Sequence, residues 1–174
     1  QVGYFKLAQS LINLILLPLD PFIWPTYTEI SRTVAQKQWH ATRQLLRRIS
    51  LITASAVAAI GGFLALTGWF LLPLLYGKEA LPAYPALLIL LAGYGFASIF
   101  QWNRPLLLAL GLPGYPVLVA LVAGLAELAL IFAIVPKLGY LALAGILSAY
   151  FVVTILIIVW RGMQEINRRS LSGG

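Results

Sequence analysis

Apolar residues follow one another along most of this chain in runs that are long enough to cross a membrane as helices. About 20 helical residues span the hydrocarbon core of a bilayer. Alanine and leucine dominate these runs, and the short alternating segments of a transmembrane barrel do not occur, so the pattern favours helices. The sequence predicts five spans, at residues 4–24, 49–76, 84–110, 115–135 and 140–160.

The composition supports a membrane protein and excludes two other classes. Hydrophobic residues make up 61% of the 174 residues and charged residues only 10%, and the mean hydropathy is +0.91. A soluble domain carries about a quarter charged residues, and a disordered chain is poor in apolar residues and rich in charge. We therefore expect an all-α integral membrane protein.

Basic residues predict which end of each span is cytoplasmic. Lys6, Lys78 and Lys137 fall on one side of the predicted spans. Eight basic residues gather on the other side: Arg32, Lys37, Arg43, Arg47, Arg48, Arg161, Arg168 and Arg169. Loops rich in lysine and arginine stay inside, so this side and the C-terminus are predicted to be cytoplasmic.

The basic loop after the first span is also amphipathic over residues 34–48. Apolar side chains recur there at helical spacing while the arginines lie away from that seam. We expect a short cytoplasmic helix that lies on anionic membrane lipids. Its basic residues flank a span and have no stacking platform between them, so no nucleic-acid partner is expected.

The predicted topology also indicates whether these residues form a whole protein or part of a longer one. The first span runs from outside to inside, and the chain opens on Gln1 without the charged segment and cleavage site of a signal peptide. We therefore expect the C-terminal part of a longer protein, and a mature protein trimmed of its signal peptide is the alternative.

Three ionisable residues, Asp20, Arg104 and Glu127, are predicted near the bilayer centre, where a charge costs at least a few kcal/mol and indicates function. Asp20 continues a polar stripe of the first span formed by Lys6, Gln9 and Asn13. This stripe should face other helices or a water-filled cavity. Asp20 is alternatively the N-cap of a helix that restarts at the following proline.

Arg104 follows Gln101 and precedes Pro105 in the third span. It is a candidate for a fixed cation that holds an anionic group such as a phosphate, and snorkelling to the membrane surface is the alternative. Glu127 lies near the middle of the fourth span and shares a face with Ala123 and Gly124. It is a candidate for proton or cation coupling, or alternatively the ion-pair partner of Arg104.

Residues for catalysis or metal binding are scarce. The chain has no cysteine and a single histidine, His40, which excludes thiolate sites and a zinc centre built on several histidines. No nucleophile, phosphate-loop or metal-ligand motif occurs, and acidic residues are rare in the loops. We expect a protein that is not an enzyme and that holds no cofactor or metal.

Short sequence motifs follow one another in a fixed order from Gly3 to Trp160. In chain order they are Gly3-Tyr4-Phe5-Lys6, Trp24-Pro25-Thr26-Tyr27, Leu45-Leu46-Arg47-Arg48, Leu74-Leu75-Tyr76-Gly77-Lys78, Tyr84-Pro85, Leu108-Ala109-Leu110-Gly111 and Val135-Pro136-Lys137-Leu138-Gly139-Tyr140. In order and spacing they resemble the C-terminal half of bacterial polysaccharide or O-antigen flippases of the multidrug/oligosaccharidyl-lipid/polysaccharide exporter superfamily. The resemblance implies about five transmembrane helices that form most of one six-helix lobe in a two-lobe, alternating-access transporter.

The resemblance also implies a function, the flipping of an undecaprenyl-diphosphate-linked oligosaccharide across the bacterial cytoplasmic membrane for surface polysaccharide or lipopolysaccharide synthesis. Arg104, Gln101 and Asn13 would bind this substrate, and Glu127 and Asp20 would bind a coupling ion. The implied partners are membrane lipids, the N-terminal lobe of the same protein and a polysaccharide polymerase. A cation-coupled multidrug exporter of the same superfamily and a non-transporting membrane scaffold are the alternatives.

Overall fold

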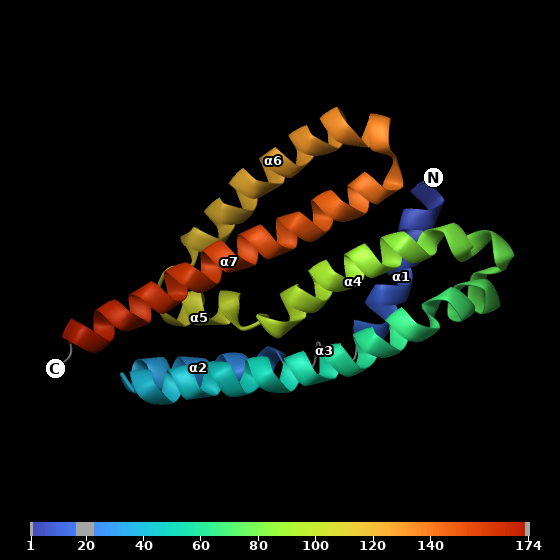
Figure 1. Ribbon diagram of the computed structural model, residues 1–174. Coiled ribbons are helices and arrows are strands. Elements are labelled where there is room, and N and C mark those ends of the chain that lie inside the picture. Colours follow the sequence, from blue (N-terminus) through green and yellow to red (C-terminus); the bar gives the residue numbers. More distant parts are fainter. Residues whose placement is uncertain (1, 17–22, 173–174) are drawn as a thin grey trace.

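The computed structural model describes residues 2–16 and 23–172, and these ranges are helical apart from short connections, with no β-strand (Figure 1). This confirms the all-α prediction. In chain order the elements are α1 (Val2–Leu16), α2 (Ile23–Ala35), α3 (Trp39–Tyr76), the 3-10 helix η2 (Lys78–Ala83), α4 (Tyr84–Ile99), α5 (Asn103–Ala109), α6 (Gly114–Leu138) and α7 (Tyr140–Ser172).

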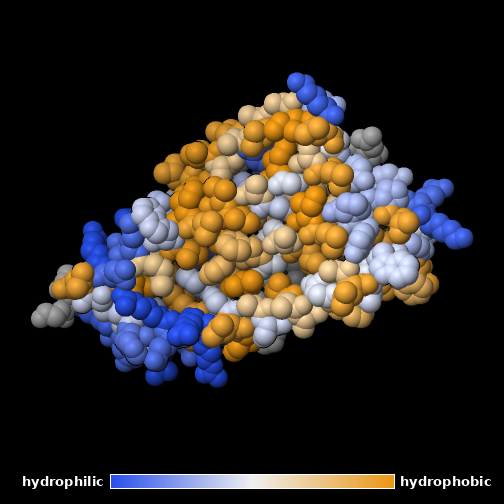
Figure 2. Space-filling model, in the orientation of Figure 1, coloured by the Kyte–Doolittle hydropathy of each residue, from blue (hydrophilic) through white to orange (hydrophobic). Residues whose placement is uncertain are grey.

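Among the described residues, four helical segments are long and apolar enough to cross a membrane, as a multi-pass membrane protein requires: Trp39–Tyr76, Lys78–Ala109, Gly114–Leu138 and Tyr140–Leu171. They coincide with the second to fifth predicted spans. The first predicted span falls on α1, on residues outside the described ones and on the start of α2, and it stays a prediction. Large apolar side chains cover much of the outer surface between two more polar ends, as contact with lipid would require (Figure 2).

Helices α4 and α7 form the centre of the described structure. α4 packs against α3, α1 and α7, and α6 runs along the other side of α7 (Figure 1). The short helix α5 lies between α2 and α7.

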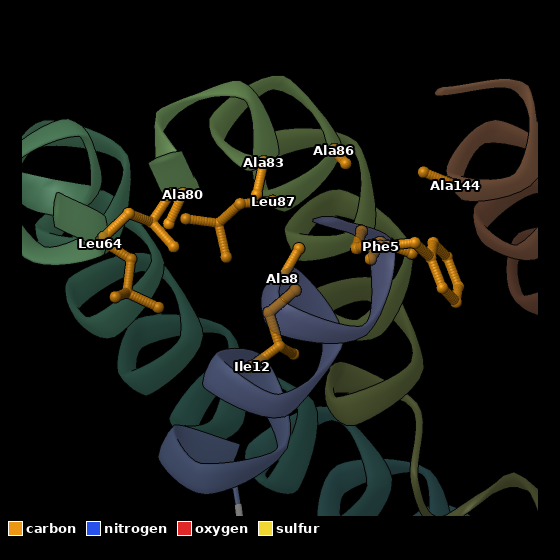
Figure 3. Packing of buried hydrophobic residues seen from close by; sticks show 11 residues of the cluster. Phe5, Ala8, Ile12, Leu64, Ala80, Ala83, Ala86, Leu87 and Ala144 are labelled. Carbon is orange, nitrogen blue, oxygen red and sulfur yellow. The ribbon is translucent and has the colours of Figure 1, made fainter. Parts of the chain in front are cut away.

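Two apolar clusters hold these helices together. The first joins α1, η2 and α4 to α3 and α7, and its small members Ala8, Ala83 and Ala86 lie between larger side chains such as Leu87 (Figure 3). Small residues allow helix backbones to approach closely, which is how helices associate in a membrane. The second cluster surrounds Trp102 and joins α2, α3, α5 and α7.

The segment at residues 34–48 does not form the separate helix that its amphipathic pattern predicts. α2 ends at Ala35, Lys37 adopts a left-handed conformation (φ 54°), and α3 then starts at Trp39. From there α3 continues without a break to Tyr76, because the sequence after Trp39 contains no proline before Pro73. The arginines of this segment therefore occupy the first turns of a membrane-spanning helix.

The third span is broken near its end. α4 ends at Ile99 and α5 begins at Asn103, so the chain turns over three residues. Pro105 explains the position of the break, because proline has no N–H and its ring clashes with the carbonyl of the residue four positions earlier, here Gln101. In the first turn of a new helix, by contrast, proline is well tolerated.

The contact between α4 and α7 is closest at Gly93. A Cβ atom added there would lie 2.6 Å from the backbone Cα of Ser148, and the hydroxyl of Ser148 donates a 2.8 Å hydrogen bond to the carbonyl of Ile89. Backbone atoms on both sides of this contact cannot move aside for a methyl group.

We expect Gly93→Ala to lower the free energy of unfolding by about 1–3 kcal/mol, the usual cost of overpacking a tight contact. Gly124→Ala in α6 is the matched control, since no atom lies within 4 Å of its added Cβ. Thermal unfolding in detergent, followed by tryptophan fluorescence, measures both. Equal stability of the two variants would contradict this close contact.

Candidate functional site

A cavity of about 820 Å³ lies beside the break between α4 and α5. Its walls come from α2 and from the consecutive helices α4, α5, α6 and α7. The lining residues are Tyr27, Ala97, Gln101, Asn103, Arg104, Pro105, Leu108, Ala120, Tyr150, Phe151, Thr154, Ile155 and Ile158. Most of this wall is apolar, and a few polar groups gather at the break, an arrangement common to binding sites for organic molecules.

The break is held in place by side chains as well as by the proline. The indole Nε1 of Trp102 donates a 2.7 Å hydrogen bond to the hydroxyl of Ser50 in α3, and Trp102 is almost fully buried. Asn103 Nδ2 donates to the carbonyl oxygen of Phe100 at 2.7 Å, which satisfies a backbone group within the turn. The polar residues that follow are thus fixed relative to α3.

Arg104 and Gln101 both line the cavity, so the structure brings together two of the three residues predicted to bind substrate. Arg104 is the second residue of α5. No aspartate or glutamate occurs among the described lining residues, and no described carboxylate forms an ion pair with Arg104. The guanidinium is therefore the dominant charge of the described cavity wall.

Asn103 is a further polar group of the cavity that the sequence did not single out. It is 6% exposed, and its Oδ1 has no hydrogen-bond partner among the described residues. Because Nδ2 already donates to the carbonyl of Phe100, the free atom is the acceptor. A buried acceptor without a partner is unusual in a folded protein.

Glu127 does not line the cavity and forms no ion pair with Arg104. The alternative role of Glu127 as the ion-pair partner of Arg104 is therefore wrong. It is half-buried on α6, two turns beyond Ala120, which does line the cavity. Two turns place it on the same face of the helix and about 10 Å farther along the helix axis. Any coupling role of Glu127 would thus act at a distance from Arg104.

The polar stripe of the first span is divided. Gln9 Nε2 donates a 3.0 Å hydrogen bond to the hydroxyl of Tyr94, so this part of the stripe faces α4, as predicted. Lys6 is exposed. The side chain of Asn13 and the whole of Asp20 lie outside the described residues, and their predicted roles stay predictions.

Glu165 is a buried charge that the sequence reading missed. Its side chain is 2% exposed, and its Oε1 accepts hydrogen bonds from Arg168 Nη2 and Arg169 Nε, each at 2.9 Å. The signal was present, since arginines follow this glutamate at the helical spacings of three and four residues. The apolar pattern did not predict burial of this side chain, because Glu165 follows the fifth predicted span.

A metal centre has no support in the described ranges. No three histidine, cysteine, aspartate or glutamate side chains of those residues lie close enough together to hold an ion. The cavity instead presents the guanidinium of Arg104, the side-chain amide of Gln101 and an apolar wall. Such a set of groups can bind an anionic molecule that also has an apolar part.

Comparisons with known proteins add no family to this picture. No protein-family model matches the chain, and neither a curated protein nor a solved structure matches it. The assignment to an exporter superfamily therefore rests on the order of sequence features alone.

Proposed function

We propose that this chain belongs to an exporter that moves an anionic, lipid-linked oligosaccharide of the undecaprenyl-diphosphate type across the bacterial cytoplasmic membrane. The observation that carries the proposal is the cavity at the broken third span, with Arg104 in its wall and no carboxylate among the described lining residues. A cationic site within a membrane-spanning bundle suits an anionic substrate.

Arg104 supplies the main recognition of the substrate in this proposal. A guanidinium is always charged and presents a planar set of donors that can bind two phosphate oxygens at once. It sits where the helix is interrupted, and non-helical backbone at membrane depth is accepted where it lines a cavity. Discontinuous helices that carry the binding site are a recurring feature of transporters.

The neighbouring groups suit the rest of such a substrate. The side-chain amide of Gln101 can both donate hydrogen bonds to and accept them from sugar hydroxyls. Leu108, Ile155 and Ile158 provide an apolar wall for the lipid part. Recognition would thus combine one charge with several weaker contacts.

Transport would proceed by alternating access between this lobe and the N-terminal lobe of the same protein. Glu127 and Asp20 are the proposed coupling residues, and Glu127 lies on the same face of α6 as the cavity-lining Ala120. The C-terminus would be cytoplasmic, and a polysaccharide polymerase would take up the exported product. A multidrug exporter would instead present acidic groups to its cationic substrates, and a scaffold would need no charge in the cavity.

The first test is complementation by the full-length protein in a host that lacks its own flippase. Loss of a charge-assisted contact of about 1.5–3 kcal/mol corresponds to roughly a 10- to 100-fold effect, so Arg104→Ala should reduce surface polysaccharide strongly. Arg104→Lys should give an intermediate result, because an ammonium cannot form the bidentate contact. Arg48→Ala, an exposed arginine outside the cavity, should keep activity at equal expression.

Two results would contradict the proposal in different ways. Full polysaccharide synthesis by Arg104→Ala would show that Arg104 does not bind the substrate and has only a packing or surface role. A parent protein that never restores polysaccharide but lowers dye accumulation would be a drug exporter, and one that does neither would favour the scaffold.

A second test fills the cavity without changing its charge. Ala120→Trp places a large ring into the cavity wall and should abolish transport, because the substrate must occupy that volume. Ala126→Trp on the same helix is the matched control, since Ala126 is exposed and does not line the cavity. Equal transport by both variants, measured as surface polysaccharide at equal membrane levels, would show that the substrate does not use this cavity.

A further inference from the structure

The helix that carries Arg104 cannot maintain its own position. α5 has only seven residues, and isolated helices of this length are not stable, so its place depends on what it packs against. Leu106 and Leu107 are fully buried between the neighbouring helices. On the α7 side, Leu106 fits against Gly162 so closely that an added Cβ would lie 2.9 Å from Leu106 Cδ2.

A single side chain of α7 also holds the end of α5. Arg169 Nη2 donates a 2.9 Å hydrogen bond to the carbonyl oxygen of Leu110, the C-cap residue of α5. The carbonyls at the end of a helix lack partners within the helix, and a cation is favourable there. Arg169 therefore joins the C-terminal end of α5 to the last turns of α7.

Glu165 sets the orientation of this arginine. Arg169 Nε donates to Glu165 Oε1 at 2.9 Å, while Nη2 of the same guanidinium reaches Leu110. Glu165 is one turn earlier on α7 and is 2% exposed. A buried carboxylate is strongly destabilising when it loses its partners, so the pair is held together and the guanidinium plane is fixed.

We propose that Arg169, oriented by Glu165, is the positioning residue that fixes α5 and thereby sets where Arg104 stands in the cavity wall. Arg104 and Leu110 are six residues apart, or about 9 Å along a helix, so a shift at one end of α5 moves the other. The consequence for transport rests on the proposed function, whereas the control of the α5 position does not.

Arg168 provides a matched control on the neighbouring position. It donates to the same oxygen of Glu165 at the same 2.9 Å, but its side chain is 74% exposed, and the described structure gives it no bond to α5. Arg168→Ala leaves Glu165 paired with Arg169 and leaves the contact to Leu110 intact. Arg169→Ala likewise leaves Glu165 with one arginine partner, Arg168, but in addition removes the bond to Leu110.

The test is a spin-label distance measurement, for which the chain is suited because it has no cysteine. Leu81→Cys with Leu108→Cys reports the position of α5 relative to η2, and Leu81→Cys with Leu156→Cys reports the position of α7. These three residues are similarly exposed, at 48%, 49% and 52%. Both pairs are measured in the full-length protein, after replacement of any cysteine outside these 174 residues by serine, in the parent sequence and with Arg168→Ala or Arg169→Ala.

We expect Arg169→Ala to shift and broaden the distance distribution of the α5 pair only, and Arg168→Ala to leave both pairs as in the parent. An unchanged α5 pair in Arg169→Ala would overturn the proposal. So would equal broadening by Arg168→Ala, or broadening of the α7 pair as well, because these results indicate general loosening of the bundle.

Transport assays then connect the position of α5 to the cavity. If Arg169 acts through Arg104, Arg169→Ala should lower transport by the parent and should have no further effect in Arg104→Ala, a non-additive result that marks coupled residues. Additive losses would overturn this link. Failure of the proposed function is distinguishable, because a chain that transports no lipid-linked sugar would still show the expected shift of α5.

Discussion

Pro105 is the constraint on which the part of this structure around the cavity depends. It cannot donate a backbone hydrogen bond, and its ring excludes the carbonyl of the residue four positions earlier. The third span therefore ends early and restarts as α5, with Gln101, Asn103 and Arg104 gathered at the interruption. An unbroken helix would distribute the same three residues around its circumference, and they could not all face one cavity.

A break at membrane depth requires that the exposed backbone groups find partners inside the protein. Here backbone and side-chain groups share this role: the carbonyl of Phe100 accepts from both the N–H and the Nδ2 of Asn103, and Arg169 donates to Leu110 at the other end of α5. The same solution holds the unbroken helices together, since Tyr84 donates to Ala65 and Ser148 to Ile89 across helix contacts. Side chains that donate to carbonyls thus supply several polar contacts between the described helices, beside side-chain pairs such as Gln9–Tyr94 and Trp102–Ser50.

The two apolar clusters divide the molecule into a tightly packed part and a part that surrounds the cavity. In the first cluster, alanines and the contact between Gly93 and Ser148 bring α1, α4 and α7 close together. In the second, the large side chain of Trp102 anchors the break to α3 through Ser50. The cavity opens on the side of this second cluster, where α5 is short and α6 packs along α7.

The sequence by itself determined the features that depend on local pattern. Runs of apolar residues predicted the four long helices, because the length of such a run is a property of the segment alone, whereas the same pattern predicted the third span as unbroken through Pro105. Only the tertiary structure decided that Arg104 does not pair with Glu127 and that Tyr150, Phe151 and Ala120 complete the cavity. It also decided that residues 34–48 are divided between two helices and that Glu165 is buried. The division of residues 34–48 depends on the left-handed backbone at Lys37. The other three findings depend on distances between segments far apart in the chain, which no periodicity within a single helix contains.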